Sequence, residues 1–433
     1  MKLASKINML KKLEHFLLAW FSYLSYGRPS KKLIIVGVTG TKGKSTASRL
    51  IASVLEAGGN KVGLLSTVEF QIADQRRPND KKMTMLGRGQ IQKMLVEMVK
   101  AGCKYAVVET SSEGILQYRH IGLNYDVVVF TNLGAEHSER HGGFENLKRD
   151  KGKIFFELLK YGNKIIAGKK VPKIVIANVD DKNADYFLGF KSDEKYRFGL
   201  LAENRPDFFG EAVEADQAGV SFVVGNKKYR LNILGKFNAY NALAAIAVGK
   251  SQCISEEKIA EGLAGVKLVE GRMEVIDEGQ NFKVIVDYAH EPMSLTELFT
   301  SLRQMVGDKK VIAVVGSDGG GRDKGKREKM GEIAGRLADL VVITDVNCFD
   351  EDPREIAEML AIGARKAGKK DGLDLFIEVD RKSGIEKAIS LAAVGDAVVI
   401  TAKGTEPCVC VSGGRKIPWD DRGVAREILK SIV

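Results

Sequence analysis

The chain alternates short apolar runs with longer segments in which apolar residues recur every three or four positions. This alternation is typical of buried parallel strands that are joined by helices. One series of runs covers residues 61–67, 104–110, 126–132 and 172–178; a second covers residues 282–288, 309–316, 339–344, 373–379 and 396–401. We therefore predict an α/β protein with two successive parallel sheets.

The passage from the first series to the second falls near Leu268–Gly271. It predicts a parallel-sheet domain over residues 31–268 and a Rossmann-like C-terminal domain over residues 269–433. Residues 200–233 suggest local β structure inserted in the first domain, with Gly225 and Asn226 at a hairpin turn.

A short N-terminal segment, residues 1–30, precedes these domains. Its apolar residues follow a helical stripe through Leu10, Leu13, Leu17, Trp20 and Leu24. The apolar part is too short to span a bilayer, and no cleavage site of a signal peptide follows it. We expect a helix that packs on its own protein or on a twin subunit, with peripheral contact to a membrane surface as the alternative.

The stretch with the most specific chemistry is GTKGKST, residues 40–46, which follows an apolar run and opens an amphipathic helix. Such a turn presents backbone N–H groups and a helix N-terminus to phosphates, while a lysine reaches the β and γ oxygens. The spacing departs from the common GxxxxGK[ST] rule, because Val38 stands where the first glycine would be. We predict that the first domain is a P-loop-type ATPase domain. The ATP-binding residues would be Gly40, Thr41, Lys42, Gly43, Lys44, Ser45 and Thr46.

Composition agrees with a cytoplasmic enzyme that handles anionic substrates. The chain has 433 residues and a net charge of +11, but its basic residues are scattered and not interleaved with aromatic ones. We therefore expect no nucleic-acid partner. The five cysteines form no CxxC pair, which argues against a disulfide framework or a zinc site.

Two further polar residues, Glu109 and His137, follow apolar runs at predicted strand ends. Open α/β sheets bind ligands at the carboxyl ends of their strands. Both side chains could therefore face the phosphate loop and ligate a metal ion.

A series of motifs in the same order resembles the Mur ligases, above all the members that add the third amino acid of the cell-wall peptide. The motifs are GTKGKST at 40–46, VVETSSEG at 107–114, TNLGAEHSERHG at 131–142, GKFNAYNALAA at 235–245, EGRMEVI at 270–276, VDYAHEP at 286–292 and GSDGGGRDKGKREKMG at 316–331. The resemblance implies an ATP-dependent ligase that phosphorylates a carboxylate and lets an amine attack the acyl phosphate. Its partners would be a UDP-linked muramoyl peptide, or a related acid acceptor, and a free amino acid.

The resemblance also implies roles for individual residues. Catalytic residues would be Lys44, Lys151 and His290, and further ATP contacts would come from Asn238, Arg272 and Asp287. Ser45, Glu109, His137 and Lys151 would hold Mg²⁺, and Thr84, Ser111, Arg119, Asn347 and Glu406 would contact substrate.

Lys151 lies fourteen residues after His137, as the carbamylated lysine of the family does after its matching histidine. A carbamate forms only on a neutral amine, so the resemblance implies that Lys151 is buried. The alternative is a surface lysine in a run of basic residues.

The chain departs from the family pattern at three points. The family carries a whole UDP-binding domain ahead of the phosphate loop, whereas here we expect only a helix, so UDP recognition would be reduced, moved or absent. Glu113 replaces a histidine of the family. Phe349 stands where diaminopimelate-adding members carry an arginine, so the distal carboxylate of diaminopimelate would lose its partner, while lysine or another diamine is conceivable.

Two other functions fit parts of the pattern. Folylpolyglutamate synthase has a short N-terminus and a similar phosphate loop, but residues 131–142, 271–276 and 402–407 favour the muramoyl ligases. A non-enzymatic nucleotide-binding regulator on the same scaffold is the third possibility, and retention of Lys44, Glu109, His137 and Lys151 argues against it.

Overall fold

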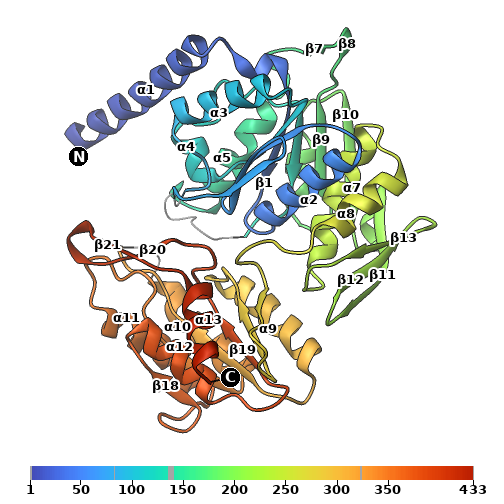
Figure 1. Cartoon of the computed structure of the whole chain (residues 1–433). Coiled ribbons are helices and arrows are strands. Elements are labelled where there is room, and N and C mark those ends of the chain that lie inside the picture. Colours follow the sequence, from blue (N-terminus) through green and yellow to red (C-terminus); the bar gives the residue numbers. More distant parts are fainter. Residues whose placement is uncertain (1, 82, 135–140, 322–323, 433) are drawn as a thin grey trace. The chain divides into compact units, whose positions relative to one another are not determined.

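The computed structural model describes residues 2–81, 83–134, 141–321 and 324–432, with side chains of the first helix from residue 13 onward. The chain forms two compact units, shown in blue to yellow-green and in yellow to red in Figure 1. The first contains Met1–Glu214, Gly219–Asn232 and Phe237–Lys267, and the second contains Ala215–Ala218, Ile233–Lys236 and Leu268–Val433.

The first unit is built on one sheet of eleven strands in the order β13-β12-β11-β10-β9-β6-β1-β5-β2-β3-β4. The pair β10-β11 is parallel, and so are all neighbouring pairs in the run β10-β9-β6-β1-β5-β2. The pairs β2-β3, β3-β4 and β12-β13, toward the two edges of the sheet, are antiparallel. The strands are β1 (Ile34–Thr39), β2 (Val62–Leu65), β3 (Glu69–Ile72), β4 (Gln75–Pro78), β5 (Tyr105–Glu109), β6 (Val127–Phe130), β9 (Ile174–Asn178), β10 (Glu194–Gly199), β11 (Phe208–Asp216), β12 (Gly219–Val224) and β13 (Lys227–Leu231).

Helices cover both faces of the parallel part, which is why its strands are apolar at every position. On one face α2 (Lys44–Ala57) packs against α7 (Asn238–Ser251) and α8 (Glu256–Gly265). Gly262 permits this approach, because a Cβ at that position would lie 2.6 Å from the Cα of Val54. The core of the other face joins alternate strand residues to α3 (Arg88–Lys100), α4 (Ser112–Leu116) and α5 (Phe144–Phe156). The short helix α6 (Ala184–Leu188) adds Phe187, whose ring stacks on Phe130 with the centroids 3.9 Å apart.

The second unit has its own sheet of six strands in the order β14-β15-β19-β16-β17-β18. Only the edge pair β14-β15 is antiparallel. The strands are β14 (Glu274–Ile276), β15 (Lys283–Val286), β16 (Val311–Val315), β17 (Leu340–Ile343), β18 (Leu375–Ile377) and β19 (Ala397–Ile400). The helices are α9 (Pro292–Val306), α10 (Gly325–Leu337), α11 (Pro353–Lys366), α12 (Arg381–Ser390) and α13 (Asp421–Ile432).

The structure confirms the predicted α/β class, and each of the nine apolar runs contains a strand. The hairpin turn at Gly225 and Asn226 is also confirmed, since β12 and β13 pair antiparallel on either side of it. No apolar pattern predicted β4, because its residues are all exposed. Nor did the sequence indicate the short hairpins β7 (Ile165–Ile166) with β8 (Lys169–Lys170) and β20 (Cys408–Cys410) with β21 (Lys416–Pro418).

The N-terminal segment forms the helix α1 (Lys2–Ser25). Its inner side packs on its own unit through aromatic rings: the ring of Phe16 contacts Tyr118, and the ring of Trp20 contacts Tyr161. Of the predicted stripe, Leu13, Leu17 and Leu24 are instead exposed, because the helix turns its aromatic side toward the unit. Tyr23 is buried against Gly122, where a Cβ would meet the tyrosine ring at 2.7 Å. Among the described helices, none is both long and apolar enough to cross a membrane.

One buried histidine makes stability depend on pH. His120 has its Nε2 atom 3.6 Å from an oxygen of Glu157. Burial, reinforced by the charges of Lys153 and Lys160, lowers the pKa of His120 from its ordinary value of 6.5 to about 3. Between these two values the folded state keeps the imidazole neutral, while the unfolded chain binds a proton. His120 therefore destabilises the fold as the pH falls through 6.5.

We expect the free energy of unfolding to fall between pH 7 and pH 5 by about 2 kcal/mol more in the parent than in the His120→Gln variant. Urea unfolding at both pH values measures the difference. Equal pH slopes for the two proteins would contradict the proposed burial of a neutral imidazole.

Candidate active site

The phosphate-binding loop lies between the end of β1 at Thr39 and the start of α2 at Lys44. Gly40 and Gly43 have φ angles of +153° and +76°, so the loop uses backbone conformations that other residues rarely adopt. Lys44 is half-buried, and its Nζ donates to the carbonyl oxygen of Thr41 at 2.8 Å. The sequence therefore folds as predicted into a strand, a glycine turn and a helix N-terminus, the arrangement that binds phosphate.

The segment after β6 holds this loop from the side. The N–H of Lys42 donates to Oδ1 of Asn132 at 2.9 Å, and the hydroxyl of Thr131 donates to the Lys42 carbonyl at 2.7 Å. The N–H of Thr41 donates to the carbonyl of Asn132 at 2.9 Å. Asn132 was missed in the sequence, although it belongs to the TNLGAEHSERHG motif, because only the histidine of that motif suggested chemistry.

Glu109 ends β5 beside the loop, as predicted. Its carboxylate accepts hydrogen bonds from the Ser45 hydroxyl at 3.0 Å and from the N–H and hydroxyl of Thr67 at 2.7 and 2.9 Å. The Thr84 hydroxyl lies 2.9 Å from the Thr67 hydroxyl and can donate to it, which links a predicted substrate residue to the predicted metal site.

These side chains supply hard oxygen donors, the type that Mg²⁺ prefers. Ser45 and Glu109 therefore fit the predicted ion, while His137 lies outside the described residues. In the described part of the chain, no group of three or more His, Cys, Asp or Glu side chains could hold a metal ion. The predicted Mg²⁺ ligands do not make up such a group, because Ser45 would contribute a hydroxyl and His137 lies outside the described residues.

Lys151 is buried on α5, and its Nζ donates to the carbonyl oxygen of Gly40 at 2.8 Å. The alternative of a surface lysine is therefore wrong. The preceding residue, Asp150, accepts from Nδ1 of His141 at 2.6 Å. Burial opposes ionisation of Asp150, but hydrogen bonds from His141 and Lys153 outweigh it and lower its pKa.

Asn238 and Asn241 lie on the first turn of α7, on the other side of the loop. Nδ2 of Asn241 donates to Oδ1 of Asn238 at 2.7 Å. Asn241 also touches the loop, because a Cβ on Gly43 would lie 2.3 Å from its Oδ1. The predicted adenine-binding residue, Asn238, therefore contacts Asn241, and Asn241 in turn contacts the phosphate loop.

The other predicted substrate residues of this unit lie on the segment after β5. Ser111 caps α4 by accepting from the N–H of Gly114 at 3.2 Å. Arg119 donates to the carbonyl of Met85, next to Thr84, and burial lowers the pKa of its guanidinium. These contacts bring Thr84, Ser111 and Arg119 to the side of the sheet edge that holds Glu109.

In the second unit, three predicted residues surround the end of β15. Asp287 accepts from the N–H groups of Met273 and Ala289, both at 2.7 Å, and burial raises its pKa. The guanidinium of Arg272 lies over the ring of Tyr288, 4.6 Å from its centroid. Nδ1 of His290 is 2.8 Å from the carbonyl oxygen of Tyr288.

Asn347 and Glu406 also meet in the second unit, although 59 positions separate them. Nδ2 of Asn347 donates to Oε2 of Glu406 at 3.0 Å and to Oδ1 of Asp318 at 2.7 Å. The fully buried Lys403 donates to the same Glu406 oxygen at 3.0 Å. Asp318 and Lys403 were not predicted, although both belong to motifs that the sequence analysis quoted.

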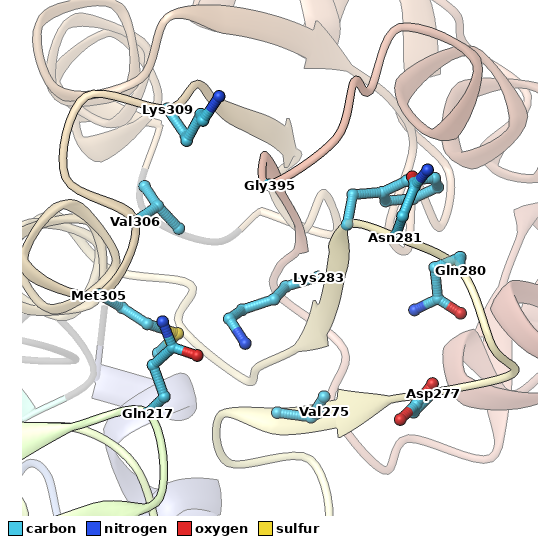
Figure 2. A pocket seen from close by; sticks show the side chains of 11 residues that line it. Gln217, Val275, Asp277, Gln280, Asn281, Lys283, Met305, Val306, Lys309 and Gly395 are labelled. Atoms are coloured by element: carbon cyan, nitrogen blue, oxygen red, sulfur yellow. The ribbon is translucent and has the colours of Figure 1, made fainter.

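Figure 2 shows a pocket in this unit that contains none of the predicted site residues. Its lining includes Lys283 at the start of β15, Met305 and Val306 at the end of α9, and Gly395 ahead of β19. These residues lie at the amino ends of the strands. Ligands of open α/β sheets bind at the carboxyl ends, where Asp287 and Asn347 lie.

Comparisons with known proteins agree with this geometry. The family models "Mur ligase middle domain" and "Mur ligase, glutamate ligase domain" match residues 38–249 and 271–404. The chain is 38% identical over 413 residues to a UDP-N-acetylmuramyl-tripeptide synthetase of Roseiflexus, covering 94% of this chain and 80% of that protein.

Two solved structures are also similar. A UDP-N-acetylmuramoyl-L-alanyl-D-glutamate–2,6-diaminopimelate ligase has a TM-score of 0.61 and 28% identity, and the match covers 92% of this chain and 79% of that one. A folylpolyglutamate synthase of Mycobacterium tuberculosis has a TM-score of 0.69 with 16% identity, covering 90% and 96%, which shows a shared fold alone.

The contact of Gly43 with Asn241 gives a matched test of the loop. We expect Gly43→Ala to weaken ATP binding at least about tenfold, because the new methyl group would displace Asn241. Gly59→Ala is the control, since Gly59 has a similar φ of +80° but open space around its Cβ position. Both variants should lose about 1 kcal/mol of stability through backbone strain. Calorimetric titration with ATP separates them, and equal affinities would refute the role of this contact.

Proposed function

The chain belongs to the Mur ligase family, and we propose that it joins an amino acid to the carboxylate of a UDP-linked muramoyl peptide at the expense of ATP. This reaction would serve the synthesis of peptidoglycan precursors. The observation that carries the proposal is the convergence of Ser45, Glu109 and buried Lys151 on the phosphate loop.

The chemistry would run in two steps. The acceptor carboxylate attacks the γ-phosphorus of ATP, which forms an acyl phosphate and releases ADP. The amine of the incoming amino acid then attacks the acyl carbon, loses a proton, and expels phosphate from a tetrahedral intermediate. Both steps develop negative charge around phosphoryl and carbonyl oxygens, and fixed cations and N–H donors stabilise that charge.

Each part of the first unit has a role in these steps. Lys44 would clamp the β and γ oxygens, and the N–H groups at the start of α2 would bind the phosphates. Ser45 and Glu109 would hold Mg²⁺, with His137 as a further predicted ligand. When bound, the ion supplies positive charge that offsets the charge of the γ-phosphoryl group. Thr84, Ser111 and Arg119 would position the acceptor.

Burial of Lys151 supports a carbamate at this position. Removal from water favours the neutral amine, which is the form that captures CO₂. Capture of CO₂ releases a proton and leaves an anion, so Lys151 would become a further ligand for Mg²⁺. Asp150, held by His141 and Lys153, would fix the turn of α5 that presents the amine.

In the second unit, Arg272, Asp287 and His290 would contact ATP or the reacting phosphate, and Asn347 with Glu406 would receive the amino acid. Glu406, held by Asn347 and Lys403, would offer its carboxylate to the side-chain ammonium of the incoming amino acid. Phe349 offers no cation to a distal carboxylate, so the site would favour lysine over diaminopimelate, whose distal end is zwitterionic.

A phosphate-release assay that crosses amino acids with UDP-muramoyl dipeptide and with folate acceptors tests the function. We expect turnover with the muramoyl acceptor only. Lys44→Ala, which truncates a half-buried side chain at the start of α2, should lower this turnover by at least about 10²-fold without a change in melting temperature. Turnover with folates alone would establish the folylpolyglutamate alternative, and ATP binding without turnover would establish a regulator.

The proposed carbamate on Lys151 predicts that added acetate and added ethylamine differ in their effect on the activity of the Lys151→Ala variant. We expect acetate to restore part of the activity of Lys151→Ala, because the missing group is a carboxylate-like anion. Ethylamine at the same concentration is the control. Rescue by the amine and not by acetate would show that Lys151 acts as a cation.

The amino-acid site gives a second prediction. We expect kcat/KM for lysine to be at least about 30-fold that for meso-diaminopimelate, since an unpaired buried carboxylate costs about 2 kcal/mol. Competition at equal concentrations measures the ratio. Phe349→Arg should lower it by supplying a carboxylate partner, whereas Arg354→Ala, at an exposed position on the first turn of α11, should not change it. A parental preference for diaminopimelate would overturn the prediction.

A further inference from the structure

Although the inner side of α1 packs on the first unit, its other side remains apolar and exposed. Leu13, Leu17, Leu18, Phe21 and Leu24 lie on this outer side, with exposed fractions from 45% for Leu18 to 70% for Phe21. An apolar stripe of this length in water costs free energy unless something covers it. In Figure 1 the N-terminal half of α1 extends beyond the rest of the unit.

A second group of exposed apolar residues lies next to the base of this helix. Phe156, Leu159 and Ile165 are 73%, 38% and 75% exposed. They belong to a segment that touches α1 and the residues after it, because Tyr161 contacts the ring of Trp20 and Lys164 donates to the carbonyl of Leu33. We call the outer side of α1 together with residues 156–170 the α1 surface.

The α1 surface is accompanied by basic residues. Residues 2–32 contain seven lysines and arginines and one acidic residue, Glu14. Arg28, Lys31 and Lys32, just after α1, are exposed, and so are Lys160, Lys169 and Lys170 in the second segment. Apolar residues beside lysines, in a helix that cannot span a bilayer, are typical of helices that lie in the interface of an anionic membrane.

We propose that the α1 surface binds the enzyme peripherally to a membrane with anionic head groups. The leucines and Phe21 enter the boundary between head groups and acyl chains, and the lysines lie at the level of the lipid phosphates. A second copy of the chain is the competing occupant. It is disfavoured because pairing two such surfaces would bring many like charges together with only Glu14 and Glu157 to offset them.

Co-sedimentation of the full chain with vesicles tests this proposal. We expect binding to vesicles of phosphatidylcholine mixed with phosphatidylglycerol, with an affinity at least about tenfold higher than for phosphatidylcholine alone, falling as salt is added. Leu17→Glu combined with Phe21→Glu should lower the affinity at least about tenfold. Leu373→Glu is the control, because Leu373 is 67% exposed in the second unit.

The basic residues have a matched control of their own. Lys31→Glu with Lys32→Glu should weaken binding to anionic vesicles, whereas Lys227→Glu with Lys228→Glu, on β13, should not. Phosphate release with soluble substrates and the melting temperature should stay at the parental values in all four variants, which shows that the fold is intact.

Two results would overturn the proposal. One is equal sedimentation of the parent and the Leu17/Phe21 variant with anionic vesicles, including no sedimentation of either. The other is a dimer of the parent in light scattering that the Leu17/Phe21 variant dissociates while vesicle binding is unchanged. The second result would assign the α1 surface to a second copy of the chain.

Discussion

The position of β1 between two parallel strands is the constraint on which the nucleotide site depends. Its register pairs Val38 with Glu109 on one side and Thr39 with Phe130 on the other. Parallel strands end at the same edge, so this register brings the phosphate loop, Glu109 and the Thr131–Asn132 segment together. A shift by one residue would turn Glu109 to the opposite face of the sheet and separate it from Ser45.

A buried charge cluster fixes the opposite edge of the same sheet. Asp126, just ahead of β6, accepts from the N–H of Ile35 at 2.8 Å and from Lys164 and Lys173 at 2.6 and 2.9 Å. Burial lowers the pKa of Lys164 to about 8, so Asp126 offsets only part of the desolvation of this lysine. The cluster therefore links β1, the start of β6 and the residue ahead of β9 at one edge of the sheet. Polar atoms hold the sheet at its amino edge, and the carboxyl edge carries the groups that we propose bind ligands.

The sequence predicted the elements of the site better than the contacts between them. Apolar runs located nine strands, and GTKGKST located the loop, because both signals are local in the chain. Asn132, Thr67 and Lys403 were missed because their partners lie far away in sequence: Asn132 bonds Lys42, 90 positions distant, and Thr67 bonds Glu109, 42 positions distant. Lys151 shows the same limit. Its basic neighbours alone fit a surface residue, and only the resemblance to the Mur ligases predicted the burial that the packing of α5 produces.

The amino-acid end of the site illustrates how a fixed background sets selectivity. Lys403 is fully buried and bonds Glu406, Cys408 and Asn347, so the glutamate is held in one orientation before any substrate arrives. Asn347 is held in turn by the N–H of Cys410 at 2.9 Å, and Phe349 bonds Cys410 through its own N–H at 3.0 Å. Phe349 has a φ of +52°, a strained conformation for an aromatic residue, and its ring packs on Gly320. The hydrogen bonds from Cys410 to Asn347 and from Phe349 to Cys410 thus maintain both the orientation of Asn347 and the strained backbone of Phe349. A side chain exchanged at position 349 would inherit this geometry, so we expect charge at that position, and not flexibility of the loop, to decide which amino acid the proposed site accepts.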